Sequence, residues 1–117
     1  MLDDLRLRRT TEDGSLVLAI GGELDIGSAP RLREEITILV DGGCTRLVLD
    51  MGEVTFLDSS GLSVLIMGLK RLRERGGDLL LRAVNPQPRA VLEMTGITRL
   101  LGLSELGDEA RPEPGAS

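Results

Sequence analysis

Two neighbouring serines, Ser59 and Ser60, follow an aspartate in the stretch VTFLDSSGLSVL, residues 54–65. A serine hydroxyl does chemistry either as an activated nucleophile or as the acceptor of a phosphoryl group. A nucleophile needs a general base, and the chain has no histidine. Its one lysine, Lys70, lies ten residues along the same predicted helix, about 15 Å away at 1.5 Å rise per residue. The sequence therefore argues against a serine hydrolase.

Nucleotide hydrolysis is disfavoured as well. The chain has 15 glycines, but it contains no GxxxxGK[ST] loop and no GxGxxG after a predicted strand. The pairs Gly21-Gly22 and Gly42-Gly43 are more typical of turns and helix ends than of a phosphate-binding loop.

The remaining interpretation makes a serine the substrate of a kinase. A hydroxyl at a helix start is accessible, and a phosphate there is favoured by the helix dipole and the free backbone donors. It would also add about −1.5 to −2 charges beside Asp58, with Glu23 and Asp25 at the end of a predicted strand. If the sheet brings that strand end beside Asp58, a phosphate about 7 Å from each carboxylate is repelled by roughly 1 kcal/mol per carboxylate in water. An interface covering the site raises this penalty, so phosphorylation would expel a protein partner.

Each motif also has a simpler interpretation when taken alone. Serine and aspartate are common helix caps, which accounts for DSSG, and GELD at 22–25 can be a strand end followed by a polar turn. On the predicted helix, Val64 and Met67 point away from the apolar stripe of Leu62, Leu65 and Leu69. We expect these two side chains to be exposed apolar contacts for a partner, the alternative being that they pack against a neighbouring element.

Composition limits the remaining function classes. The 117 residues suffice for one domain, which we place at 1–107, with a disordered tail rich in Pro, Gly and charge at 108–117. Phe56 is the only aromatic residue, so Leu, Val, Ile and Met must build the core. A net charge of −5 without a basic arm argues against direct nucleic-acid binding. Apolar runs too short for a bilayer indicate no membrane partner and a cytoplasmic protein. With a single cysteine, Cys44, and no histidine we expect neither a zinc site nor any cofactor.

Strand and helix periods alternate along the chain. The turn signal Asp13-Gly14 makes the first two strands a hairpin, and Ser28 is a predicted helix cap. We expect a connection from 52 to Asp58 and, near the end, a strand or helical turn at 99–103. The predicted strands are 2–9, 15–24, 45–51 and 78–84, and the predicted helices are 29–41, 60–75 and 86–96. The fold class is α/β, a mixed sheet of four to five strands flanked by about four helices and opening with a hairpin.

An ordered set of motifs extends over most of the chain. It consists of GELD at 22–25, FLDSSGL at 56–62, Gly76-Gly77 before a strand, and MTGI at 94–97. Together these motifs resemble the anti-sigma factor antagonists with a STAS domain, and the similarity covers about residues 14–103. The resemblance implies a STAS-like sheet and a partner-switching role without catalysis. The unmodified protein would bind an anti-sigma factor that is also a serine kinase and so release a sigma factor, and a serine phosphatase would restore the binding form.

The resemblance also implies roles for individual residues. Ser59 is the expected phosphoacceptor, and Ser60 the less favoured one, more typical of a cap or a neighbouring contact. Asp25 and Asp58 are its acidic surroundings, Glu23 is a weaker candidate, and Gly61 completes the site. Two other functions stay open: a STAS module that senses a nucleotide or lipid, and a scaffold subunit of a signalling complex. Self-association is open as well.

Overall fold

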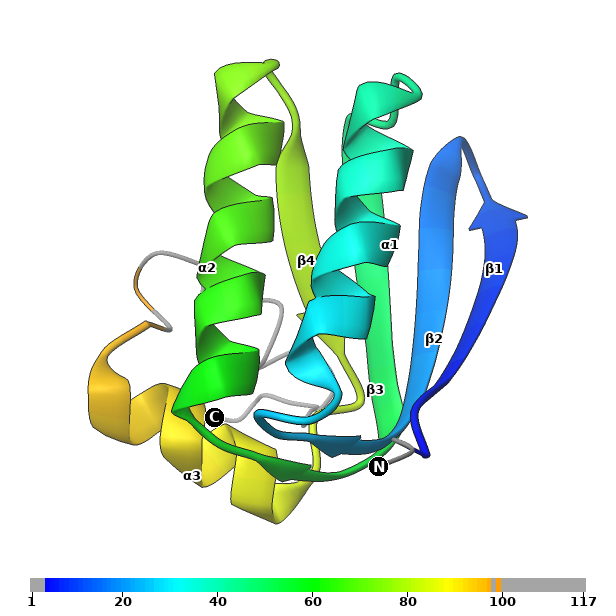
Figure 1. The fold of residues 1–117 in the computed structure, drawn as a ribbon. Coiled ribbons are helices and arrows are strands. Elements are labelled where there is room, and N and C mark those ends of the chain that lie inside the picture. The colour runs from blue at the N-terminus through cyan, green and yellow to red at the C-terminus, as the bar shows by residue number, and fades with distance from the viewer. Residues whose placement is uncertain (1–3, 98, 100–117) are drawn as a thin grey trace, which may run out of the picture.

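The computed structural model describes residues 4–97 and residue 99. A four-stranded mixed sheet, ordered β1-β2-β3-β4, opens with an antiparallel hairpin and continues with two parallel pairs, which confirms the predicted fold class. Three helices accompany it in the described part of the chain. The element bounds are β1 Arg6–Glu12, β2 Ser15–Leu24, α1 Ala29–Asp41, β3 Arg46–Leu57, α2 Ser59–Glu74, β4 Asp78–Arg82 and α3 Pro86–Thr95 (Figure 1). The predicted domain end at 107, the tail 108–117 and most of 99–103 lie outside the described residues.

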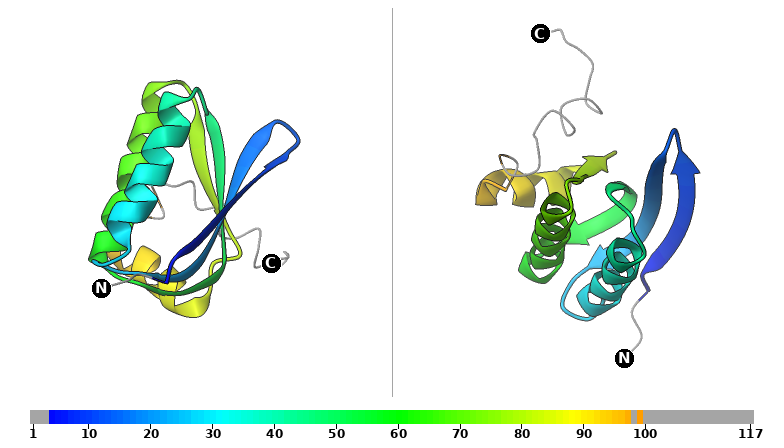
Figure 2. Two further views of the ribbon diagram at one scale, coloured as in Figure 1. Left: turned by 45° about the vertical axis from the view of Figure 1, so that its right-hand side comes forward. Right: turned by 90° about the horizontal axis from the view of Figure 1, so that it is seen from above.

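Helices cover one face of the sheet. Figure 1 shows α1 and α2 side by side in front of the strands, with α3 across the end of β3. The views in Figure 2 show no helix of the described residues on the opposite face of the sheet, which we call the outer face. Alternate strand residues point toward the helices and are fully buried, among them Leu18, Ile20, Leu47 and Leu49. The core is aliphatic, as composition predicts, because Phe56 is 38% exposed.

The third strand is longer than predicted. The sequence pattern predicts a strand at 45–51 followed by a connection, but β3 runs from Arg46 to Leu57 and pairs with β2 to its end. Register shifts between Ala19 and Gly21 and between Gly22 and Glu23 interrupt the pairing. A bulge breaks the period-2 alternation of buried residues. The second half of the strand therefore lacks the alternating pattern by which a strand is predicted.

Smaller differences concern strand ends. β1 begins at Arg6 within the described residues, whereas the prediction began at 2. β4 ends at Arg82 instead of 84, because Ala83 adopts a positive φ of 59° that strands do not allow. Of the helices described, none is long and apolar enough to cross a membrane.

Candidate functional site

The ends of β2 and β3 bring the GELD and DSSG motifs together. Leu24 pairs with Leu57 and Glu23 with Phe56 in the parallel register. Beyond the ladder, the Asp58 N–H donates to the carbonyl oxygen of Leu24 at 3.2 Å. The condition set by the sequence, that the sheet places Glu23 and Asp25 beside the Asp58 turn, is therefore met.

Asp58 begins α2 as its cap. Its backbone is extended, and its Oδ1 accepts hydrogen bonds from the N–H groups of Ser60 at 2.8 Å and Gly61 at 3.3 Å. Of the two expected roles of Ser60, cap or neighbouring contact, the cap is wrong, because both serines already belong to the first turn and a cap must stand outside it, while Ser60 does contact Asp58. A carboxylate at this position also interacts favourably with the helix dipole.

Accessibility separates the two serines. Ser59 is the first residue of α2 and is exposed, whereas Ser60 is half-buried. The Ser59 carbonyl accepts a hydrogen bond from the Ser63 hydroxyl at 3.0 Å. Its own hydroxyl has no hydrogen-bond partner among residues 4–97. Ser59 thus presents an exposed hydroxyl at the positive end of a 16-residue helix.

The loop after β2 is fixed by its own side chains. Asp25 Oδ1 accepts from the N–H groups of Gly27 at 3.0 Å and Ser28 at 3.1 Å. The Ser28 hydroxyl donates to the Glu23 carbonyl and accepts from the Asp25 N–H. Ser28 stands at the predicted cap position of α1, but its hydroxyl makes no cap bond because these partners occupy it. Asp25 is therefore half-buried and held, while Glu23 is exposed.

Gly61 lets α2 approach the strand ends closely. A Cβ built on Gly61 would lie 2.7 Å from Leu57 Cδ1 and 2.8 Å from the Cβ and carbonyl oxygen of Leu24. Its backbone does not have a positive φ, so the glycine is required by packing. The helix start that carries Ser59 rests directly on both strands.

The expected apolar contacts on α2 are only partly available. Val64 is 1% exposed, so its prediction as an exposed contact is wrong, and Met67 is half-buried against the core. The reason is that α1 packs against this side of α2. A Cβ built on Gly68, one turn beyond Val64, would lie 3.3 Å from Ile36 of α1. The side of α2 that carries Val64 therefore faces α1 instead of solvent.

Two exposed apolar side chains near the motifs were missed by sequence reasoning. Ile26, in the loop after GELD, is 79% exposed, and Phe56, paired with Glu23, is 38% exposed. An isoleucine between an aspartate and a glycine in a turn is the signal that would have singled out Ile26. A hollow of about 680 Å³ adjoins this loop and is lined by Glu23, Asp25, Ile26 and Glu53 among others.

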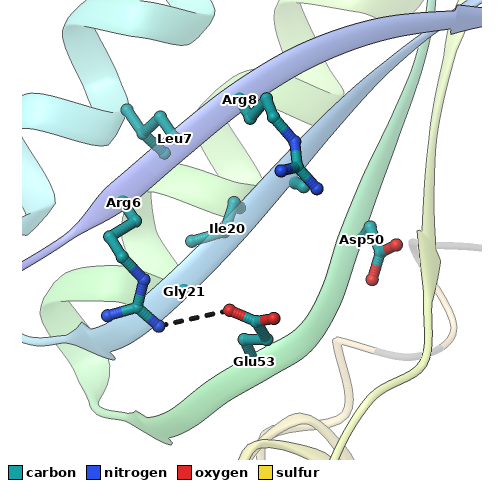
Figure 3. Close-up of a pocket in the computed structure, with 8 residues that line it drawn as sticks. Arg6, Leu7, Arg8, Ile20, Gly21, Asp50 and Glu53 are labelled. Carbon is teal, nitrogen blue, oxygen red and sulfur yellow. Dashed lines mark hydrogen bonds and ion pairs between the residues drawn. The ribbon is translucent and has the colours of Figure 1, made fainter.

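The outer face has a smaller hollow of about 210 Å³ over β2. Figure 3 shows Arg6 and Arg8 reaching into it from β1, with Asp50 and Glu53 opposite on β3. Arg6 forms an ion pair with Glu53 at 3.2 Å.

Elsewhere, partial burial raises the pKa of the Cys44 thiol. No cluster of metal-ligating side chains forms within the part of the chain that the structure describes.

Comparison with known proteins agrees with this geometry. The model of the STAS domain family matches residues 6–110. The chain is 30% identical to BtrV of Bordetella bronchiseptica, a protein provisionally named as an anti-sigma factor antagonist. The match covers 91% of each chain. The anti-sigma-B factor antagonist of Staphylococcus aureus is 28% identical over 87% of this chain and 94% of its own.

Solved structures show the same fold. An anti-sigma factor antagonist from Mycobacterium paratuberculosis superimposes with a TM-score of 0.73 at 30% identity, over 83% of this chain and 82% of that one. The antagonist SpoIIAA in its unphosphorylated form gives 0.70 at 23% identity, over 82% and 84% of the two chains. SpoIIAA of Bacillus has also been solved in a phosphorylated form.

Proposed function

This chain belongs to the STAS domain family of anti-sigma factor antagonists, and on that basis we propose that it acts by partner switching. In its unmodified form it binds an anti-sigma factor that is also a serine kinase, in the cytoplasm, and thereby releases a sigma factor. Phosphorylation of Ser59 ends the complex, and a serine phosphatase restores the binding form. The protein works by binding and does not itself catalyse a reaction.

The main support for the proposal is the exposed hydroxyl of Ser59, which has no hydrogen-bond partner among residues 4–97 and lies beside an acidic strand end. At the first position of α2 a phosphate is compatible with the helix, since the dipole and backbone donors favour it. The same phosphate is close to Asp58 and to the GELD strand end, where like charges repel. The modification therefore leaves the fold intact and penalises any partner that excludes water from this end of the molecule.

The phosphorylated form of SpoIIAA supports the view that this fold accepts a phosphate. At 23% identity its bearing on the present chain is the fold alone, so the choice of Ser59 rests on the chain's own geometry. The exposure of Ser59 and the partial burial of Ser60 support it as the acceptor.

The partner surface that we propose surrounds Ser59. Ile26 and Phe56 supply its apolar contacts, and Glu23 and Asp25 its acidic rim. Exposed apolar side chains ringed by charges are typical of protein–protein contact sites. Met67 contributes only through its exposed part, and Val64 supports the surface from beneath.

Mass spectrometry with a binding assay tests the proposal. The protein and its Ser59→Ala and Ser60→Ala variants are incubated with ATP, Mg²⁺ and each anti-sigma kinase of the source cell, and complexes are separated by gel filtration. We expect one phosphate on wild type and on Ser60→Ala, none on Ser59→Ala, and loss of the complex upon phosphorylation. A phosphate on Ser60 alone overturns the assignment. A stable complex without phosphate indicates a scaffold. If the protein is not phosphorylated and forms no complex, but its melting temperature rises when a nucleotide is added, it is a ligand sensor.

A further inference from the structure

Within the described residues, no strand lies beside the last residues of β3 on the β4 side. β4 pairs with residues Arg46 to Asp50 of β3 only, whereas β3 continues to Leu57. On the other side, β2 follows β3 to its end. Backbone groups left without a ladder need other partners when they are screened from water. On the β4 side, the segment leading into Asp58 and Ser59 therefore needs partners other than the strands that the structure describes.

Two side-chain amides at the start of α3 take the place of that strand. Asn85 Nδ2 donates to the carbonyl oxygens of Gly52 at 3.1 Å and Val54 at 2.8 Å. Gln87 Oε1 accepts from the Leu57 N–H at 2.8 Å, and its Nε2 donates to the Leu57 carbonyl at 3.1 Å. A primary amide carries the same donor and acceptor as a peptide group. Gln87 therefore forms with Leu57 the two-bond pair that a strand residue would form.

The backbone on either side of Gln87 is restrained. Pro86 and Pro88 flank it in the first turn of α3, and each proline ring fixes its own φ. Pro88 is buried, and α3 packs against β3. The two hydrogen bonds of the Gln87 amide thus fix the Leu57 backbone relative to the start of α3.

Leu57 immediately precedes the turn that carries the proposed phosphoacceptor. The next residue, Asp58, is held by its N–H bond to the Leu24 carbonyl and by its cap bonds to the start of α2. From this geometry we infer that Gln87 is a positioning residue: it fixes the Leu57 backbone and so sets the orientation in which the Ser59 hydroxyl meets a kinase. The kinetic part of this inference rests on the proposed phosphorylation of Ser59.

A merely structural clamp is the competing interpretation, and the chain offers a matched control for it. Asn85 is a second amide clamp on the same helix start, but it holds residues 52 to 54, away from the turn. Gln87→Ala and Asn85→Ala each remove one side-chain amide from the β3 edge. Only Gln87→Ala frees the residue that adjoins Asp58.

Amide hydrogen exchange and backbone chemical shifts measured by NMR test the positioning directly. In Gln87→Ala we expect roughly tenfold faster exchange of the Leu57 amide, whose acceptor is lost, together with shift changes at Asp58 and Ser59. In Asn85→Ala the changes should be confined to residues around 52 to 54. Gln87→Glu keeps an acceptor for the Leu57 N–H but loses the donor to its carbonyl, so intermediate exchange is expected. Unchanged signals at 57 to 59 in Gln87→Ala overturn the inference.

Phosphorylation kinetics supply the functional readout, at a temperature where circular dichroism shows all variants folded. With the kinase that modifies wild type, Gln87→Ala should lose about tenfold in kcat/KM, mainly through kcat, because misorientation affects the reacting complex. Asn85→Ala should stay within about twofold of wild type. Equal rates for the two variants contradict the inference. If no kinase modifies the wild type, the proposed function fails, while the exchange experiment still decides whether Gln87 positions the turn.

Discussion

Arg82, on the edge strand β4, makes two hydrogen bonds to Glu12 on the opposite edge strand β1, at 3.1 and 3.2 Å. The same guanidinium also contacts Asp50 of β3 at 3.4 Å. These bonds cross the outer face of the sheet and link its two edges. The hydrogen bonds and charge of Arg82 lower the pKa of the Glu12 carboxyl from its ordinary value of 4.5.

This link predicts a pH dependence of stability. A carboxyl whose pKa is lowered by folding stabilises the protein above its unfolded pKa of 4.5, and the contribution is lost as pH falls through the lower folded value. Because the pair is exposed, the effect should be small and reduced by salt. Arg82→Gln should therefore lower the urea midpoint slightly at pH 7, with a difference from wild type that shrinks below pH 4.5. A difference that is independent of pH would show that Arg82 acts through packing alone.

Gly61→Ala should destabilise the protein. The new methyl would lie within 2.8 Å of Leu24 backbone and side-chain atoms, so the start of α2 must shift, at a cost of about 1 to 3 kcal/mol in the free energy of unfolding. Gly68→Ala is the matched control in the same helix, since its nearest contacts are side-chain atoms of Ile36 at 3.3 and 3.4 Å. There, strain is offset by the better helix propensity of alanine, about 1 kcal/mol. Urea denaturation compares the two, and equal losses would contradict the packing argument.

Substitutions at Asp58 separate its cap from its charge. Asp58→Ala removes the acceptor for Ser60 and Gly61 and should cost about 1 kcal/mol, which lowers Tm by roughly 4 °C in a chain of 117 residues. Asp58→Asn keeps an acceptor oxygen and should stay closer to the wild-type Tm. Thermal unfolding followed by circular dichroism distinguishes the two variants. If Asp58→Asn lowers Tm as much as Asp58→Ala does, the carboxylate charge matters more than the cap bonds.

Ile26 offers a test of the proposed partner surface. Because it is 79% exposed, Ile26→Asp should change the free energy of unfolding by less than about 0.5 kcal/mol. If Ile26 is a central apolar contact of the proposed surface, Ile26→Asp should weaken binding of the anti-sigma factor by about tenfold or more. Ile38→Asp is the control, since Ile38 is also exposed but lies near the other end of α1. Isothermal titration calorimetry gives both dissociation constants, and equal binding by the two variants would exclude the surface around Ile26.

Much of the fold could be predicted from local patterns. The hairpin is encoded by Asp13-Gly14, and α2 by its apolar stripe and by the glycines after it. The second half of β3 could not be found this way, because its bulge breaks the alternation that identifies a strand. On the side away from β2, its partners are the side-chain amides of Asn85 and Gln87, which are about 30 residues away in sequence.

The sequence predicted that two motifs adjoin, but not the contacts between their residues. The motifs GELD and DSSG identified the residues that the sheet brings together. Which of them caps the helix depends on where the first turn begins, one residue earlier than the pattern indicated. The burial of Val64 depends on the packing of α1 beside α2, which no periodicity within a single helix contains.

The parallel order of β2, β3 and β4 gives the molecule two distinct ends. The proposed switch occupies the end where β2 and β3 finish. The opposite end includes tight turns at Gly14, Gly43 and Gly76, each with a positive φ and open space around the missing Cβ. A fluorescent reporter or peptide tag inserted at the Asp13-Gly14 turn would stand a full strand length from Ser59. Biosensors of the switch can therefore be built there without touching the surface that they are meant to observe.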